Sequence, residues 1–248
     1  MGGIPNAFRK TRWTEILRAK TDDLTRRKIA VDKLIATYWK PVYCYLRHKG
    51  FGNEVAKDLT QGFFHEIVLG RDLIQQADQA KGRFRTFLLR ALERYVVDVH
   101  RGETRKKRRT KKGTVRLEPD ELANLPTLKA GVTPEQAFHY GWAADLLDQV
   151  LGEVKDEYCT TGRATYWEVF RSKILTPIFD NVKGPSFAEI CKKHGIDGES
   201  KASNMMITVK RRFRTILIRH LRKLVGSDSE VEEEFREFLK ILSEGRAG

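Results

Sequence analysis

The sequence predicts an all-α protein with two small helical domains joined by a basic flexible linker. Apolar residues recur at helical spacing along most of the chain, whereas strand-like alternation is poor. A run of basic residues, followed by a stretch with three prolines and no clear period, separates two helical blocks. We therefore expect a first helical domain, a linker, a second helical domain and an acidic C-terminal helix or tail at residues 11–101, 102–134, 135–225 and 226–248.

The first block opens with an apolar stripe formed by Leu34, Ile35, Tyr38, Val42 and Leu46. Pro41 interrupts this stripe, so we expect it to kink the helix or to begin a new helical segment. A turn with two glycines follows, and Asn53 after it is expected to cap the next helix.

The helix after Asn53 has apolar residues at every fourth position, which predicts one buried face: Val55, Leu59, Phe63 and Ile67. The opposite face is small and sparsely charged, with Asp58, Gln61, Gly62 and His65. Such a face is unusual in a chain that has 47 Lys and Arg residues against 33 Asp and Glu. The pattern alone leaves two interpretations open, a protein-contact face or simply the solvated side of a helix.

The last helix of the first block lies in the segment from Lys81 to Arg101. Its inward residues are expected to be Phe84, Phe87, Leu88, Ala91, Tyr95 and Val99. Its outer side is expected to carry Arg90, Arg94, Asp98 and Arg101. Phe84 and Tyr95 therefore belong to the predicted core, although an aromatic ring at either position is also suited to stacking on a base.

In the second block, Ser186 and Glu189 form a capping box, which predicts a helix that begins at Ser186. Gly195 is expected to end this helix with a positive φ angle, and Ile196 to fill the corner. Because a second helix is expected to begin near Glu199, the arrangement predicts a helix-turn-helix.

The second of these helices is strongly basic, with eight basic residues and no acidic residue between Lys201 and Val225. Its outward residues are expected to be Lys201, Asn204, Thr208, Arg211 and Arg212. Short polar side chains flanked by arginine are suited to reading DNA bases in the major groove and to binding phosphates. A solvated helix face remains the alternative, but such a face usually mixes both signs of charge.

Composition supports a polyanionic partner, since the formal net charge is +14 and the isoelectric point about 9.7. The three cysteines are far apart, which argues against a zinc site or a disulfide framework and fits a reducing compartment. We find neither a signal peptide nor an apolar segment of membrane-spanning length. The expectation is a soluble, cytoplasmic protein without a membrane span.

The sequence does not predict an enzyme. We find no glycine-rich phosphate loop, no HExxH, no Ser-His-Asp arrangement and no carboxylates at metal-ligand spacing. We therefore expect no catalytic residues, no metal and no cofactor.

Three stretches of the first block, "YWKPVYCYLR", "AKDLTQGFF" and "GRFRTFLLRALERYVVDVHR", resemble the second conserved region of bacterial RNA polymerase sigma factors. The resemblance is to the extracytoplasmic-function (ECF) type of the sigma-70 family. The residues of these stretches are most similar to those of a subgroup abundant in planctomycete-like bacteria. The second block resembles the fourth conserved region of that family. Together the two regions cover about two thirds of the chain.

This resemblance implies a sigma factor that directs RNA polymerase to promoters and aids promoter opening in transcription initiation. Asp58, Gln61 and His65 would contact the β′ clamp of core polymerase, whose β flap is a further partner. The −10 promoter element would be held by the cations Lys81, Arg83, Arg85, Arg90, Arg94 and Arg101. The −35 element would be read by Lys201, Asn204, Thr208, Arg211 and Arg212. The resemblance is also compatible with an anti-sigma factor as a partner, and it implies that the free protein is a monomer.

The chain departs from the family pattern at several places. Arg94 stands where many members carry Asn, so the −10 preference is expected to differ. Ser227–Glu244 has seven acidic residues and apolar residues at helical spacing, which predicts an acidic amphipathic helix. By charge complementarity, this tail is expected to fold back on the basic helix beginning near Glu199 and mask it. The competing function is a stand-alone helix-turn-helix regulator of transcription, which would dimerise on palindromic DNA.

Overall fold

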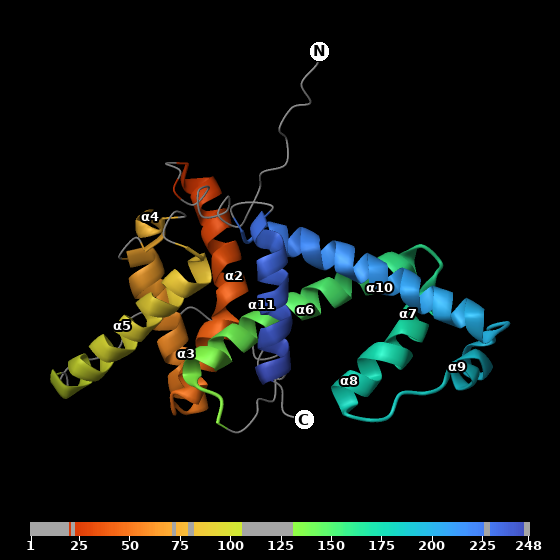
Figure 1. Cartoon of the computed structure of the whole chain (residues 1–248). Helices are drawn as coiled ribbons and strands as arrows, with labels where there is room; N and C mark the ends of the chain where they lie inside the picture. Colours follow the sequence, from red (N-terminus) through yellow and green to blue (C-terminus); the bar gives the residue numbers. More distant parts are fainter. Residues whose placement is uncertain are drawn as a thin grey trace, which may run out of the picture. The chain divides into compact units, whose positions relative to one another are not determined.

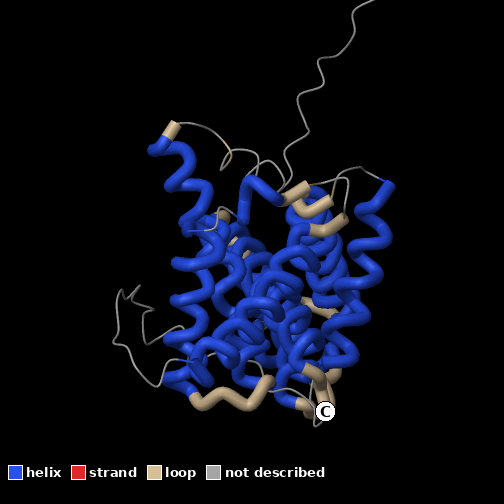
Figure 2. The backbone as a smooth tube through the Cα atoms, turned by 90° about the vertical axis from the view of Figure 1, so that its left-hand side faces the viewer, coloured by secondary structure: helices blue, strands red, loops and turns tan. Residues whose placement is uncertain are grey.

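The computed structural model describes residues 20, 23–70, 73–78, 82–105, 131–225 and 229–245 of the chain. Every regular element in these residues is a helix, and they contain no strand (Figure 2). The predicted all-α class is therefore confirmed. The chain divides into two compact units, one with residues 1–145 and 222–247 and the other with residues 146–221.

Within the described residues, the first unit contains five complete α-helices, one π-helix and the first part of α6, and Figure 1 labels the α-helices. In chain order these elements are α2 (Leu24–His48), α3 (Asn53–Gly62), the π-helix η1 (Phe63–Gly70), α4 (Leu73–Gln76), α5 (Phe84–Arg105), α6 (Pro134–Thr160) and α11 (Ser229–Gly245). The largest fully buried side chains come from α2, η1, α5, α6 and α11: Tyr43, Tyr45, Leu46, Phe63, Leu88, Leu92, Phe138 and Phe238. One apolar core thus joins helices that are far apart in the sequence.

Helix α2 begins after Asp23, whose carboxylate accepts hydrogen bonds from the backbone N–H groups of Thr25 and Arg26. The helix continues through Pro41, so the expectation of a new helical segment at this residue is wrong. Pro41 is buried, and α6 approaches it closely at Gly141. A Cβ atom on Gly141 would lie 3.3 Å from Cα of Pro41 and 3.2 Å from Sγ of Cys44. Tertiary packing here overrides the local preference against proline.

The expected apolar face of α3 is partly wrong. Val55 is 49% exposed, whereas Ala56, Thr60 and Phe63 are fully buried. An α-helix has 3.6 residues per turn, so residues spaced by four drift around its surface and cannot keep one face. Gly62 also lies on the inner side, because a Cβ atom there would collide with the hydroxyl group of Tyr95 from α5.

Asn53 does not cap α3 as expected. It is the first residue of the helix, and the capping position is Gly52, which has no side chain to accept a hydrogen bond. The Asn53 side chain instead accepts a hydrogen bond from the hydroxyl group of Tyr43 in α2. The polar side chain therefore ties α3 to the preceding helix.

The second unit contains the later part of α6, followed by helices α7 to α10. These are α7 (Ala164–Phe170), the π-helix η4 (Arg171–Leu175), α8 (Thr176–Asp180), α9 (Phe187–His194) and α10 (Glu199–Arg222). A core cluster joins α7, α9 and α10 through Val169, Ile190, Ile196, Ala202 and Met205. The unit therefore has an apolar core of its own.

The predicted start and end of α9 are confirmed. Ser186 accepts a hydrogen bond from the backbone N–H of Glu189, and the Glu189 carboxylate accepts one from the backbone N–H of Ser186 at 2.7 Å. Gly195 ends the helix with a φ angle of 62°, and Ile196 is 8% exposed. The two helices therefore meet through a short turn whose apolar residue enters the core.

The two compact units differ from the expected domain bounds. Residues 135–145 of α6 and the whole of α11 belong to the first unit, whereas we expected them in the second domain and in a separate tail. The apolar contacts of α11 explain this difference, since Phe238 packs against Trp142 of α6. Most of the expected linker, residues 106–130, lies outside the described residues. Among the described helices, none has the length and apolar character needed to cross a bilayer.

Candidate nucleic-acid and protein interfaces

The first candidate interface is the outer side of α3 and η1. Asp58 and His65 are exposed, and Gln61 is partly buried. Asp58 and Gln61 are three residues apart on α3, so their side chains lie on neighbouring positions of one helix face. The structure therefore places Asp58 and Gln61 together on an accessible surface. Gly62, which we also expected there, faces inward.

The second candidate interface is a row of arginines on α5. Arg90, Arg94 and Arg101 are all exposed, as the sequence predicted, and Asp98 shares their side. Their spacing of four and then seven residues keeps them on one stripe of the helix. Val97 lies on the same stripe and is 48% exposed, although we did not single it out. Val97 stands seven positions after Arg90, and this spacing in the sequence could have predicted a surface that is partly basic and partly apolar.

Arg83 and Arg85 have a different environment from the rest of this set. Arg85 contacts two glutamates of α11, with its Nη1 atom on Glu234 and its Nη2 atom 2.9 Å from Oε1 of Glu237. Arg83 contacts the same two glutamates, with Nε 2.9 Å from Oε2 of Glu234, and also lies 3.5 Å from Glu233. We call these five residues the arginine–glutamate network. Lys81, the remaining expected cation of this set, lies outside the described residues.

The centre of the network, Arg85 with Glu234, is shielded from solvent, whereas Glu233 at its edge is exposed. The side chains of Arg85 and Glu234 are 4% and 0% exposed. Burial alone would lower the pKa of Arg85, but Glu234 and Glu237 more than reverse this effect, so the pKa lies above its ordinary value. Arg85 is therefore a buried cation that is fully charged and paired.

The third candidate interface is the outer face of α10. Lys201, Asn204, Thr208 and Arg211 are all exposed, and their spacing of three, four and three residues follows one helix face. The hydroxyl group of Thr208 donates to the backbone carbonyl of Asn204 at 2.8 Å. Ile207, which helical periodicity did not predict to be exposed, lies beside this face and is 36% exposed.

Arg212 differs from the other predicted residues of α10. Its guanidinium group forms a two-pronged contact with the Glu157 carboxylate of α6, with Nε and Nη2 at 2.9 and 2.8 Å from Oε2. The hydrogen bond that Arg212 donates to Glu157 is the main cause of a raised Arg212 pKa. Arg212 therefore positions α10 against α6 within the second unit.

A second contact joins the same two helices further along. Glu153 of α6 accepts hydrogen bonds from Arg219 and from Nε2 of His220, the latter at 3.0 Å. The hydrogen bond from Arg219 is the main cause of a lowered Glu153 pKa. These pairs are more exposed than the network of the first unit, with Arg219 48% and Glu153 38% exposed.

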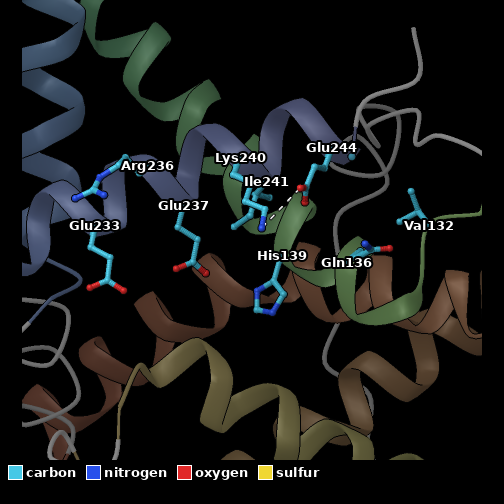
Figure 3. Close-up of a pocket in the computed structure, with 10 residues that line it drawn as sticks. Val132, Gln136, His139, Glu233, Arg236, Glu237, Lys240, Ile241 and Glu244 are labelled. Atoms are coloured by element: carbon cyan, nitrogen blue, oxygen red, sulfur yellow. Dashed lines mark ion pairs between the residues drawn. The ribbon is translucent and has the colours of Figure 1, made fainter.

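A cavity of about 470 Å³ lies between α6 and α11 in the first unit (Figure 3). Its lining includes His139 from α6 and Glu237, Lys240 and Ile241 from α11. Burial, followed by the charge of Arg85, lowers the pKa of His139. Glu233 and Glu237 extend from the same side of α11. The residues that the structure describes contain no cluster of three His, Cys, Asp or Glu side chains suited to a metal ion.

We compared the chain with protein-family models, with curated proteins and with solved structures, and none of them matched it.

Proposed function

We propose that this chain is a sigma factor of the ECF type, a dissociable subunit that directs bacterial RNA polymerase to promoters and helps to open them. The observation that carries the proposal is the exposed stripe of Arg90, Arg94, Val97 and Arg101 on α5. It belongs to the stretch whose sequence resembles the −10 region of sigma factors. The stripe offers cations for phosphates and one apolar contact for a base.

The physical requirements of promoter opening fit this surface. Melting leaves unpaired bases outside the stack, and unstacking costs a few kcal/mol per base. Arginine side chains and the phosphate backbone interact without sequence preference, and their affinity falls steeply with salt. The α5 stripe would therefore supply affinity for the separated strand, whereas base choice needs additional contacts.

Two further surfaces support the same proposal. The exposed Asp58 and the adjacent Gln61 provide a polar face whose nearby cation, Lys57, is paired with Glu54, and such a face suits a protein target better than phosphate. The exposed face of Lys201, Asn204, Thr208 and Arg211 suits the major groove of the −35 element. Neither DNA surface needs to bind tightly, because joining both to one polymerase raises their effective concentration.

The test is a pull-down with purified core bacterial RNA polymerase. The wild-type chain should bind core polymerase, and Asp58→Ala/Gln61→Ala should lose most of this binding. A matched control is Asp156→Ala/Gln149→Ala, which changes the same residue types at exposed positions of α6 in the second unit. Failure of the wild type to bind core polymerase would reject the proposal.

The turn between α9 and α10 favours one competing function, a stand-alone helix-turn-helix regulator. The capped start of α9, the positive φ angle of Gly195 and the buried Ile196 are the features that such a motif requires. This regulator would bind a palindromic duplex as a dimer without polymerase. A monomer that engages duplex promoter DNA only with polymerase would favour the sigma factor.

A further inference from the structure

The arginine–glutamate network joins two segments that lie far apart in the sequence. Arg83 and Arg85 stand at the start of α5, and Glu233, Glu234 and Glu237 come from α11, about 150 residues later. Both helices belong to the first unit. Charge complementarity predicted that the acidic helix would cover α10, but its contacts with arginines in the structure are with Arg83 and Arg85.

Three carboxylates surround two guanidinium groups in this network. Charged side chains are almost never fully buried unless they are paired, so Arg85 and Glu234 depend on each other. A guanidinium group binds a carboxylate and a phosphate with the same planar geometry. The glutamates of α11 therefore occupy these two arginines in the way that a nucleic-acid backbone would.

Aromatic packing encloses Arg85 further. Its guanidinium group lies 4.3 Å from the ring centroid of Trp142 in α6. The ring of Phe238 from α11 meets the same tryptophan edge-on, with the ring centroids 6.3 Å apart. Arg85 is thus covered by α6 on one side and by α11 on the other, and no phosphate reaches it while α11 is in place.

The packing of α11 on the first unit is incomplete. Val231 and Phe238 are buried, but Leu239 is 48% exposed and the cavity separates part of α11 from α6 (Figure 3). The buried charge network and the apolar contacts of Val231 and Phe238 therefore share the attachment of α11. Carboxylates and phosphates compete directly for a guanidinium group, so a contact of this kind is open to displacement by a polyanion.

We propose that α11 is an intramolecular competitor that occupies Arg83 and Arg85 until the phosphodiester backbone of single-stranded DNA displaces it. This inference rests on the part of the proposed function that assigns these arginines to nucleic acid. The competing carboxylates are tethered to the same chain, so they act at a high effective concentration. Duplex DNA would not displace them, whereas a single strand held by the adjacent α5 stripe would, whatever its sequence.

The displacement also sets how strongly the protein binds DNA before it joins a promoter complex. When the competent state is only a fraction of the population, the apparent affinity falls by that fraction. Removing the competitor should therefore raise single-strand affinity without any new contact to DNA. Arg90, Arg94 and Arg101 remain exposed in both states and provide the basal binding.

The test measures binding of a fluorescent single-stranded oligothymidine to the full chain at low salt. In Glu234→Gln/Glu237→Gln the two carboxylates become amides of the same shape, and we expect about tenfold tighter binding than for the wild type. The control Glu232→Gln/Glu244→Gln changes the same net charge at exposed positions of α11 outside the network and should bind like the wild type. Equal affinity of all three proteins would overturn the inference.

A second measurement uses only the wild-type chain, so it does not depend on the folding of a variant. Backbone hydrogen exchange in residues 229–245 should become faster when the oligonucleotide is present at saturation. Unchanged exchange in this segment would overturn the inference. The polymerase pull-down is separate from both measurements: tighter DNA binding by the network variant without polymerase binding would reject the sigma proposal alone.

Discussion

The two basic helices, α5 and α10, both place arginines against glutamates of another helix, but they do so at different depths. At the start of α5, Arg85 and its partner Glu234 are 4% and 0% exposed. On α10, Arg219 and its partner Glu153 are 48% and 38% exposed. Removing one partner of a buried ion pair strongly destabilises the fold, whereas an exposed ion pair contributes little to stability. The number of cations on a helix therefore does not tell how many of them a ligand can reach.

The largest expected effect comes from breaking the buried pair. Arg85→Ala removes one of the two guanidinium partners of the buried Glu234 and leaves only the partly exposed Arg83, so we expect the free energy of unfolding to fall by about 3 kcal/mol. Arg219→Ala on α10 should change it by less than about 1 kcal/mol. Urea unfolding of both variants measures the difference. A similar loss of stability in both variants would show that burial of the ion pair does not determine its contribution to stability.

A smaller effect is expected on the binding of single-stranded DNA, which should depend on the exposed arginines of α5 and not on those of α10. In Arg94→Gln, the slope of log affinity for single-stranded DNA against log salt should fall by about 0.7, because one phosphate contact is lost. Arg211→Gln on α10 is the matched control, and its slope for the same single strand should equal that of the wild type. A slope that is equally reduced in both variants would assign single-strand binding to the two helices alike.

The smallest expected effect is a response to acid. Burial raises the pKa of Glu237, but Arg85 and Arg83 lower it by more, so the pKa lies below that of an ordinary glutamate. A depressed pKa in the folded state gives stability that is fully present above the unfolded pKa, about 4.3, and is lost as the pH falls through the folded value. Attachment of α11 should therefore weaken only below about pH 4.

Near-ultraviolet circular dichroism measures this acid response, since Trp142 contacts both Arg85 and Phe238. The signal of Trp142, obtained by comparison with Trp142→Phe, should stay constant from neutral pH down to the ordinary glutamate range and decrease below it. A decrease that is complete well above pH 4 would contradict the assignment to Glu237.

Local patterns predicted local structure well. The capping box at Ser186, the positive φ angle of Gly195 and the buried Ile196 all follow from short-range chemistry, and the structure has each of them. The inward positions of Phe84 and Tyr95 on α5 also follow from helical periodicity. In each case the deciding interaction lies within a few turns of the residue itself.

The predictions failed where a distant helix decides the outcome. Pro41 remains inside α2 because α6 packs against it at Gly141, and Gly62 faces inward because Tyr95 of α5 approaches it. The charged partners of Arg83 and Arg85 come from the far end of the chain. Charge complementarity predicted that the acidic helix would meet a basic one, but it could not choose between two basic helices.

The close approach of α2 and α6 at Gly141 also has a chemical consequence. It encloses Cys44, and burial raises the pKa of this thiol to about 12. Because the thiolate is the reactive form, Cys44 resists alkylation and oxidation as long as the two helices stay together. Cys159, in the second unit, is exposed. Cys159 is thus open to a dye in the native state, whereas the labelling rate of Cys44 reports each opening of the core of the first unit.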